Sequence, residues 1–187
     1  LKYNLNLTGN EIIVLQHPDT TEPHKSKEQI LATLKAVIET KHNAIIIGPN
    51  MDTGNDSINK TIKKYLKNNS LKFFKSLPRE DYLGLLKNCK LLIGNSSSGI
   101  IESTVFKIPV VNIGDRQKGR EHGPNVINVK KFSQKNISKS LSKSLSMNKT
   151  NLRIKNIYGN GMAAEKIVKY LEKINIDQRL LKKEIRY

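Results

Sequence analysis

The chain has 187 residues, with 33 Lys and Arg against 16 Asp and Glu, and so carries a formal charge of +17. This length suits one domain, or two very small ones, with a core large enough to fold unaided. No apolar stretch approaches the roughly 20 residues that span a bilayer, which excludes a membrane protein. The single cysteine, Cys89, excludes a disulfide framework and a cysteine-based zinc site.

The same features give two expectations about the source of the chain. A lone cysteine fits a reducing compartment, so we expect a cytoplasmic protein. The chain begins with Leu1 and not with methionine, and no basic-then-apolar signal follows. We therefore expect a piece of a longer protein that lacks its N-terminal part.

The excess of positive charge raises the question of nucleic-acid binding, since the pI is near 9.9. However, the lysines are scattered in pairs such as Lys63-Lys64, Lys130-Lys131 and Lys182-Lys183, and aromatic residues make up only 5% of the chain. Few side chains are therefore present for base stacking. We favour a solvated lysine-rich surface that also attracts small anions, and keep a nucleic-acid-binding module as the alternative of a different class.

Short apolar runs alternate with segments of helical periodicity along the chain. In order, the predicted elements are a strand at 11–16, a helix at 22–41, a strand at 44–48, a helix at 57–68, a strand at 71–74, a helix from 78, a strand at 91–94, a helix from about 99, a strand at 109–113, a strand at 126–129, a helix from 133 and a helix from 160. Thr21 and Ser133 are the predicted caps of the first and fifth helices. The last helix is expected to include Ile174, and a polar, helical tail follows from 177 to 187.

This alternation of continuous apolar strands with helices is typical of a parallel sheet that is covered on both faces. We therefore predict an α/β fold with a doubly wound, Rossmann-like parallel sheet, as one domain over residues 1–187. In such sheets ligands bind at the carboxyl ends of the strands. The segments that follow each strand are thus the places to search for a site.

The most informative of these segments is Leu91–Glu102, in which a strand ends in a turn of small residues and a helix begins. Free backbone N–H groups and the positive helix end would favour an anion above the turn. Gly94 and Gly99 let a phosphate approach the backbone, and the hydroxyls of 96–98 add donors. The turn matches neither a Walker A loop nor a dinucleotide fingerprint. The alternative interpretation is an ordinary capped helix start.

Other segments at strand ends carry candidate side chains. Glu102, in the first turn of the helix, either complements the helix dipole or accepts hydrogen bonds from ribose hydroxyls. The loop 114–120 holds three cations, of which Arg116 is suited to a forked contact with phosphate, unless this is simply an exposed basic loop. His17 either binds a phosphate, transfers a proton or is structural. The segment 49–52 ends the second strand in the same way.

Metal and nucleophile sites find little support. His17, His24, His42 and His122 show no metal-ligand spacing among themselves or with carboxylates. Cys89 lies at the end of a predicted helix and fits a small core residue better than a nucleophile. We therefore predict no metal site.

Five motifs together resemble those of the UDP-N-acetylglucosamine 2-epimerases, most closely the hydrolysing branch of sialic acid biosynthesis. The motifs are Gln16–Glu22 (QHPDTTE), Gly48–Gly54 (GPNMDTG), Gly94–Glu102 (GNSSSGIIE), Pro109–Arg120 (PVVNIGDRQKGR) and Lys155–Gly161 (KNIYGNG). Their order and spacing fit over nearly the whole chain. The histidine-proline form of the first motif and the GDRQKGR run indicate the hydrolysing branch, since the non-hydrolysing enzymes usually show a histidine-arginine form.

The resemblance implies a glycosyltransferase-B-like enzyme of two domains with its site between them, and this chain would be the C-terminal, nucleotide-holding half. The UDP-binding residues that it implies are His17, Asn50, Leu77, Tyr82, Ser96, Ser97, Glu102 and Arg116. In this set, the two serines, the arginine and the histidine would face the diphosphate. The glutamate, Glu102, would face the ribose. The leucine backbone and the tyrosine would frame the uracil, while the asparagine lines the nucleotide site. His17 is also the implied catalytic residue of this half. The charged pair Arg79-Glu80 departs from the family pattern at the uracil wall.

The implied reaction eliminates UDP from the anomeric carbon and leaves a glycal-like species. Water then adds with inversion at carbon 2, giving N-acetylmannosamine and UDP, without a metal or other cofactor. The alternatives are a non-hydrolysing epimerase and a hydrolysing epimerase of another UDP-acetamido sugar. The implied partners are the UDP-sugar, UDP and the chain's own N-terminal half, but neither nucleic acid nor a membrane; a homo-oligomer stays open. The isolated chain is expected to bind UDP weakly and to be inactive.

Overall fold

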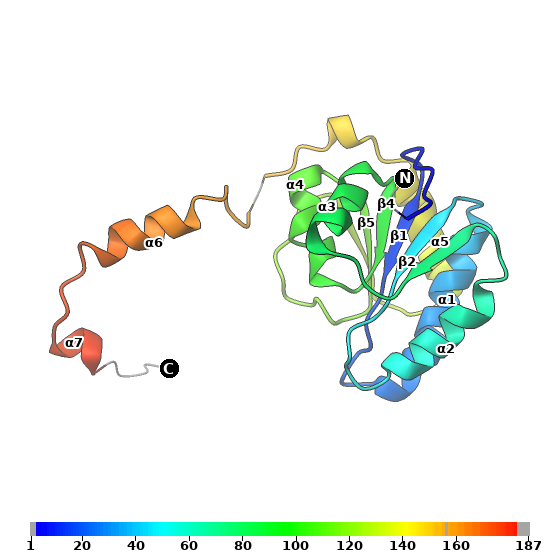
Figure 1. Cartoon of the computed structure of the whole chain (residues 1–187), viewed down its shortest axis with the longest axis horizontal. Coiled ribbons are helices and arrows are strands. Elements are labelled where there is room, and N and C mark those ends of the chain that lie inside the picture. Colours follow the sequence, from blue (N-terminus) through cyan, green and yellow to red (C-terminus); the bar gives the residue numbers. More distant parts are fainter. Residues whose placement is uncertain (1–2, 156, 183–187) are drawn as a thin grey trace. The chain divides into compact units, whose positions relative to one another are not determined.

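The computed structural model describes residues 3–155 and 157–182 (Figure 1). Contacts divide the chain into two units, one up to Ile157 and one from Tyr158. The first unit holds the sheet, and the second holds helices α6 (Ala163–Leu171) and α7 (Gln178–Leu181). None of the described helices has the length and apolar content of a membrane span. The single domain expected over residues 1–187 stays a prediction.

Six parallel strands form the sheet of the first unit, in the order β3-β2-β1-β4-β5-β6. They are β1 Ile12–Leu15, β2 Ala44–Ile47, β3 Leu71–Phe74, β4 Leu91–Gly94, β5 Val110–Ile113 and β6 Val126–Val129. All six predicted strands are confirmed, with ends that differ by a residue at most. The chain winds outward from β1 in one direction and from β4 in the other. The gap between the loops after β1 and β4 is thus the switch point at which such sheets bind ligands.

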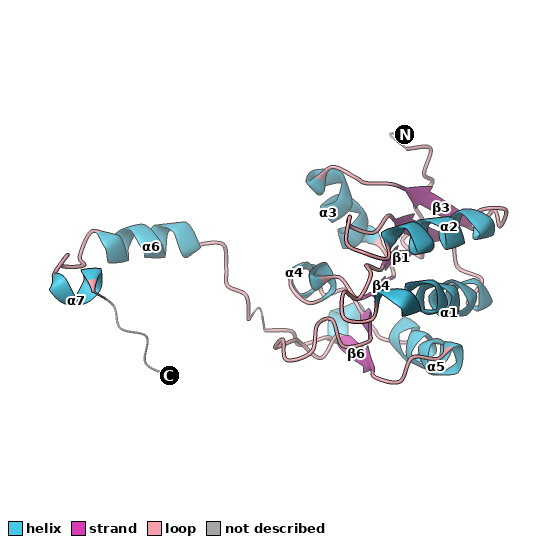
Figure 2. Ribbon diagram, turned by 90° about the horizontal axis from the view of Figure 1, so that it is seen from below, coloured by secondary structure: helices cyan, strands magenta, loops and turns pink. Residues whose placement is uncertain are grey.

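Helices cover both faces of this sheet (Figure 2). The face of α1 (Ser26–Glu39) also carries α2 (Asn55–Tyr65) and α5 (Gln134–Leu145), and α1 packs against both. On the other face lie α3 (Arg79–Asn88) and the short α4 (Glu102–Phe106). Single 3₁₀ turns occupy Pro23–Lys25, Ser97–Gly99 and Lys149–Asn151.

Alternate side chains of β1 enter two separate apolar cores. Ile12 and Val14 belong to the core beneath α1, α2 and α5, and Ile13 and Leu15 belong to the core beneath α3. All four are at most 7% exposed. A strand that is buried on both faces needs an apolar residue at every position, which explains the unbroken apolar runs of the sequence.

The capping predictions had mixed outcomes. Ser133 caps α5, since its hydroxyl accepts the amide hydrogen of Asn136. The predicted role of Thr21 is wrong: the residue at the N-cap of the first helical turn is Glu22, which makes no side-chain cap bond. Thr21 instead hydrogen-bonds to the carboxylate of Asp19, which holds the loop before the helix.

The bounds of the helices differ more from the prediction than those of the strands. The helix expected from about 99 is preceded by a 3₁₀ turn at Ser97–Gly99, and α4 starts only at Glu102; it ends at Phe106, where Lys107 takes a left-handed conformation. The last helix, α6, ends at Leu171 and so leaves out Ile174. Because α6 has no buried residue in the described unit, only its weak intrinsic propensity sets where it ends. The predicted tail is described only as far as Lys182, and Asn156 of the fifth motif also lies outside the described residues.

Gly94 makes the close approach of β4 to β1 possible. Its φ is +147°, and a Cβ placed on it would lie 1.9 Å from the carbonyl oxygen of Leu15. We expect Gly94→Ala to lower the free energy of unfolding by more than about 3 kcal/mol, since neither backbone can move without breaking the sheet. Chemical denaturation measures this change.

Gly84→Ala is the matched control. Gly84 lies inside α3, and a Cβ there meets no atom within 4 Å. This variant should gain up to about 1 kcal/mol from helix propensity. If both alanine variants had the stability of the wild type, the close approach at Gly94 would be wrong.

Candidate functional site

The segments after β1, β2, β4 and β5 meet at the carboxyl edge of the sheet. They bring His17, Asn50, the serine turn and Arg116 together, although these lie up to about a hundred residues apart in the sequence. Hydrogen bonds join all four segments, as described below. The serine turn and Arg116 thus lie on the same edge, as their positions after neighbouring strands predict.

Asn95 is the residue that joins these segments. Its side-chain oxygen accepts the backbone N–H of His17 at 2.7 Å, and its side-chain nitrogen donates to the His17 carbonyl at 2.9 Å. Its own carbonyl accepts hydrogen bonds from Gln117 Nε2 at 2.9 Å and from Arg116 Nη1 at 3.3 Å. Asn95 is 4% exposed. Neither Asn95 nor Gln117 is among the site residues predicted from the sequence. The available signal for Asn95 is a polar residue directly after an apolar strand at the switch point.

His17 is held as a neutral hydrogen-bond donor. Its Nδ1 lies 3.0 Å from the backbone nitrogen of Asn50, whose N–H can only donate. Nδ1 therefore accepts, and the ring hydrogen resides on Nε2. Burial and the charge of Arg116 lower the pKa of His17 to about 4, against the opposing effect of Asp52. At neutral pH this histidine can donate a hydrogen bond through Nε2, but it holds no free lone pair for a base.

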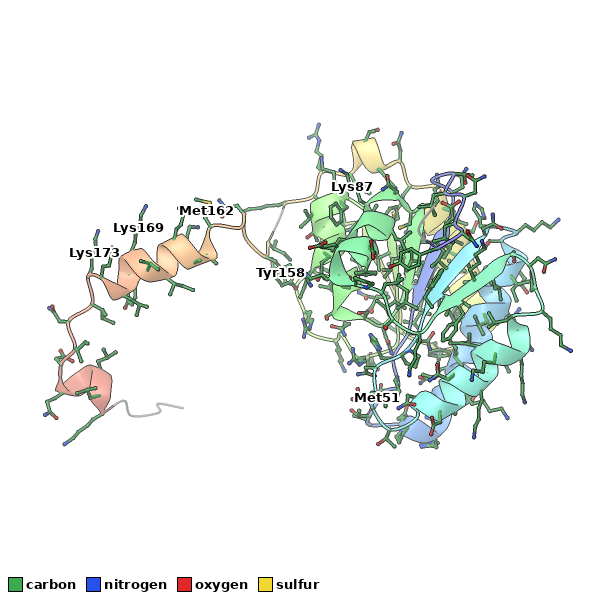
Figure 3. The ribbon with its side chains drawn as sticks, viewed as in Figure 1. Met51, Lys87, Tyr158, Met162, Lys169 and Lys173 are labelled. Carbon is green, nitrogen blue, oxygen red and sulfur yellow. The ribbon has the colours of Figure 1, made fainter. Side chains whose placement is uncertain are left out.

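The loop after β2 supports His17 from the side. Asn50 donates a side-chain hydrogen bond to the Asp52 carboxylate, while its buried Oδ1 meets no donor in the described part of the chain. Met51, between the two, is 87% exposed at the rim (Figure 3). The Asp52 carboxylate also lies 3.9 Å from Arg116 Nη2, so it orients the guanidinium.

The serine turn offers backbone donors to this edge. The amide hydrogens of Ser96 and Ser97 meet no acceptor among the residues that the structure describes. The hydroxyl of Ser96 accepts the amide hydrogen of Ser98, which fixes the turn. The helix that follows is a five-residue segment, so its dipole adds less than a long helix would. The donors that this turn offers are therefore individual amides beside Arg116, and the anion cradle stays a prediction.

Tyr82 and Glu102 lie at the far end of the same turn. The Tyr82 hydroxyl is hydrogen-bonded to Ser98 Oγ, and burial raises the pKa of this tyrosine. Glu102 Oε1 lies 3.5 Å from Arg79 Nη1, so the charged residue that departs from the family pattern pairs with the predicted ribose ligand. Leu77 packs at the margin of the core beneath α3. These contacts place Tyr82 and Glu102 beside the turn, whereas Leu77 is placed only by its packing.

Other chemistries find no support at this edge. The described residues contain no group of three His, Cys, Asp or Glu that could hold a metal ion. Cys89 is buried, and burial raises its pKa to about 12, so it is a protonated core thiol as predicted.

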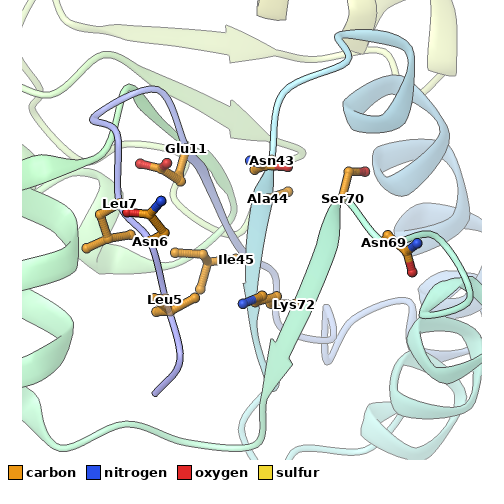
Figure 4. A pocket seen from close by; sticks show the side chains of 10 residues that line it. All are labelled: Leu5, Asn6, Leu7, Glu11, Asn43, Ala44, Ile45, Asn69, Ser70 and Lys72. Carbon is orange, nitrogen blue, oxygen red and sulfur yellow. The ribbon is translucent and has the colours of Figure 1, made fainter. Parts of the chain in front are cut away.

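A cavity at the amino ends of β1, β2 and β3 contains one carboxylate, that of Glu11 (Figure 4). Burial acts to raise the pKa of Glu11, but hydrogen bonds from Thr8 and Gly9 outweigh it and leave the pKa below its ordinary value. This carboxylate is therefore occupied in holding a turn. The cavity also lies at the edge opposite to the one where such sheets bind ligands.

The depressed pKa of His17 predicts a specific loss of stability in acid. The unfolded chain takes up a proton near pH 6.5 and the folded one only near pH 4, so stability rises with pH between these values. We expect the wild type to lose roughly 3 kcal/mol from this group as the pH falls through that window. In His17→Asn, whose Oδ1 can accept from Asn50, this part of the loss should be absent.

Denaturant unfolding of both proteins at several pH values measures the difference. A direct titration of His17 by NMR gives the pKa itself. A His17 pKa near 6.5, or parallel stability curves for the two proteins, would contradict the assignment.

Comparison with known proteins places these motifs in a family. A model of the UDP-N-acetylglucosamine 2-epimerase family matches residues 2–172. A curated relative, the UDP-N,N'-diacetylbacillosamine 2-epimerase (hydrolyzing) of Legionella pneumophila, is 33% identical over 97% of this chain and 48% of its own length. The polysialic acid biosynthesis protein P7 of Escherichia coli is 41% identical over 69% of this chain and 33% of its own. The chain spans about half the length, or less, of these relatives.

Solved structures share the fold at low identity. The Methanocaldococcus jannaschii UDP-GlcNAc 2-epimerase in complex with UDP-GlcNAc and UDP is 18% identical, with a TM-score of 0.70 over 87% of this chain and 45% of that one. The E. coli heptosyltransferase WaaC with ADP is 10% identical, with a TM-score of 0.57 over 75% of this chain and 46% of that one. The predicted α/β fold, a doubly wound, Rossmann-like parallel sheet of glycosyltransferase-B-like type, is thereby confirmed. The chain belongs to the UDP-N-acetylglucosamine 2-epimerase family.

Proposed function

We propose that this chain is the UDP-binding half of a hydrolysing UDP-N-acetylglucosamine 2-epimerase. The whole enzyme would convert UDP-N-acetylglucosamine and water into N-acetylmannosamine and UDP for sialic acid biosynthesis. The observation that carries the proposal is the position of Arg116 next to the free amides of Ser96 and Ser97, at the switch point of the sheet.

A diphosphate fits the donors of this edge. The amides of Ser96 and Ser97 would each bind an anionic oxygen, and the neutral His17 would add its Nε2–H. Arg116 uses Nη1 toward the Asn95 carbonyl, which leaves further guanidinium N–H groups for phosphate. Its side chain is 29% exposed, so a contact here would be less screened than one on an open surface.

These donors would serve the proposed reaction by stabilising the leaving group. Elimination of UDP places negative charge on the departing diphosphate, and preorganised donors aimed at that charge lower the barrier. His17 would act in this way, as a hydrogen-bond donor, and Asn50 would hold its ring. The role proposed for His17 is thus electrophilic, which its geometry favours over that of a general base.

The nucleoside would lie along the other end of the turn. Glu102 would bind the ribose hydroxyls, and the Leu77 backbone with Tyr82 would frame the uracil. The Arg79 side chain that pairs with Glu102 is 74% exposed. Because exposed ion pairs contribute little stability, ribose hydroxyls can replace Arg79 at small cost.

The branch and the sugar rest on the relatives and the motifs. The Legionella relative and a Campylobacter jejuni relative that is 40% identical over 118 residues are both named as hydrolyzing. The names of both give a diacetylbacillosamine nucleotide as the substrate. A Neisseria meningitidis relative, 37% identical over 139 residues, is instead named a UDP-N-acetylglucosamine 2-epimerase. A hydrolysing epimerase of a diacetamido sugar is therefore the first alternative and a non-hydrolysing epimerase the second.

Nucleic-acid binding is less well supported. The paired lysines 63, 64, 130 and 131 are exposed but lie on α2 and after β6, on separate elements. The aromatic residues that follow these pairs, Tyr65 and Phe132, are partly buried and pack against the core. Three further expectations stay predictions: the cytoplasmic location, a possible homo-oligomer and an N-terminal half of the enzyme outside this chain.

Arg116→Ala should lower the affinity of the chain for UDP by at least tenfold, because it removes a charge-assisted contact with the diphosphate. Titration calorimetry with UDP measures this change. Lys87→Ala is the matched control, since Lys87 lies near the end of α3, away from the carboxyl edge, and should leave the affinity unchanged (Figure 3). Equal affinity of the two variants would place the diphosphate elsewhere.

The reaction is tested on the full-length protein that contains this chain. With UDP-N-acetylglucosamine we expect free N-acetylmannosamine and UDP in equal amounts, whereas the isolated chain should give no turnover. A parallel assay uses UDP-N,N'-diacetylbacillosamine. Release of a free sugar from that substrate alone would assign the enzyme to the diacetamido sugar nucleotide instead. An epimerised UDP-sugar as the sole product would exclude the hydrolysing branch.

A further inference from the structure

A second cavity lies at the carboxyl edge and is lined in part by the loop that carries Arg116. Its volume is about 420 Å³, and it is bounded by the ends of β5 and β6 and by the loop between them. Side chains that carry a positive charge, an amide or an imidazole line much of it, among them Asn112, Lys118, Arg120, His122, Asn128 and Lys130. Of these, the side chain of Asn112 alone is deeply buried, since this residue is 5% exposed.

The charge of the cavity favours an anion. Lys118, Arg120 and Lys130 contribute three fixed positive charges, and Asp115 is the one carboxylate among the described lining residues. The three cations come from two segments, the loop after β5 and the residue after β6, and all of them line the cavity.

A chain of hydrogen bonds runs along one wall, and its direction can be worked out. His122 Nδ1 lies 3.1 Å from the carbonyl oxygen of Gly123, which can only accept, so Nδ1 carries the ring hydrogen. In the neutral ring Nε2 then accepts, and its partner at 2.9 Å is Nδ2 of Asn128. Asn128 Oδ1 in turn accepts from Asn112 Nδ2 at 2.8 Å.

This direction leaves the side-chain oxygen of Asn112 without a donor. No described residue donates to Asn112 Oδ1, and the oxygen is not among the buried, solvent-inaccessible atoms that lack a partner. A nearly buried amide that lines a cavity therefore offers it an acceptor. Because this oxygen is open to water, a bound molecule that displaces the water must donate a hydroxyl or N–H in its place or lose a hydrogen bond.

We propose that this cavity binds a small polyhydroxylated anion, a sugar acid or a sugar phosphate. The anionic group would contact Arg120, Lys118 and Lys130, and a hydroxyl would donate to Asn112 Oδ1. The proposal uses none of Ser96, Ser97 and Arg116 and so goes beyond the nucleotide site. An inorganic or simple organic anion would contact only the three cationic side chains. A neutral sugar would contact only the side-chain oxygen of Asn112.

Binding to the isolated chain is measured by titration with four probes: gluconate, glucose 6-phosphate, acetate and glucose. We expect gluconate or glucose 6-phosphate to bind at least tenfold more tightly than acetate and glucose, and the stronger of the two shows which anionic group is preferred. Arg120→Ala should weaken that binding at least fivefold. Lys63→Ala, an exposed cation at the end of α2, is the control and should have no effect.

A repeat of the titration with saturating UDP separates this cavity from the nucleotide site. We expect unchanged probe binding, since the two sites use different residues. Competition by UDP, equal binding of acetate and gluconate, or an Arg120→Ala variant that binds like the wild type would each overturn the proposal. Because Arg120→Ala removes an exposed side chain, it should fold normally, and UDP affinity tests the nucleotide site separately.

Discussion

The hydrogen bonds of Asn95 are the interaction on which the candidate site depends. One side chain binds both backbone groups of His17, and the same residue's carbonyl receives Arg116 and Gln117. Four hydrogen bonds at one buried residue join loops that the sheet alone would only bring near each other. They also give partners to polar groups that would otherwise be buried without any, whereas the amides of the next two residues meet no acceptor in the described part of the chain.

Asn95 can act in this way only because Gly94 lets β4 approach β1. The carbonyl of Leu15 lies where any larger residue would put its Cβ, and it accepts the amide of Asn95 at 3.3 Å. The same arrangement determines the chemistry of His17. Its ring is buried against the Asn50 amide, so a second proton would face another N–H group and lose hydration. Close strand packing thus produces a neutral histidine at the ligand edge.

Periodicity predicted the sheet well because each strand is buried on both faces and leaves an unbroken apolar run. It also predicted that His17, Asn50, the serines and Arg116 share an edge, since topology alone brings strand ends together. It could not predict the contacts of Asn95 and Gln117 or the Arg79–Glu102 pair, because these depend on side-chain directions that the apolar pattern does not fix. The start of α4 and the end of α6 were also missed: a 3₁₀ turn precedes α4, and α6 lacks buried residues within its described unit.

In the proposed reaction, the groups on this edge divide the chemistry between the two halves of the enzyme. The unoccupied groups that face a diphosphate are donors: the amides, the guanidinium and the imidazole N–H. The carboxylates that contact these donors are engaged, Asp52 with Asn50 and Arg116 and Glu102 with Arg79. The donors themselves can hold and stabilise a leaving diphosphate, but none of them can remove the proton at carbon 2 of the sugar. In the proposed reaction that base would therefore come from another part of the enzyme, in line with a relative of which this chain covers 48%.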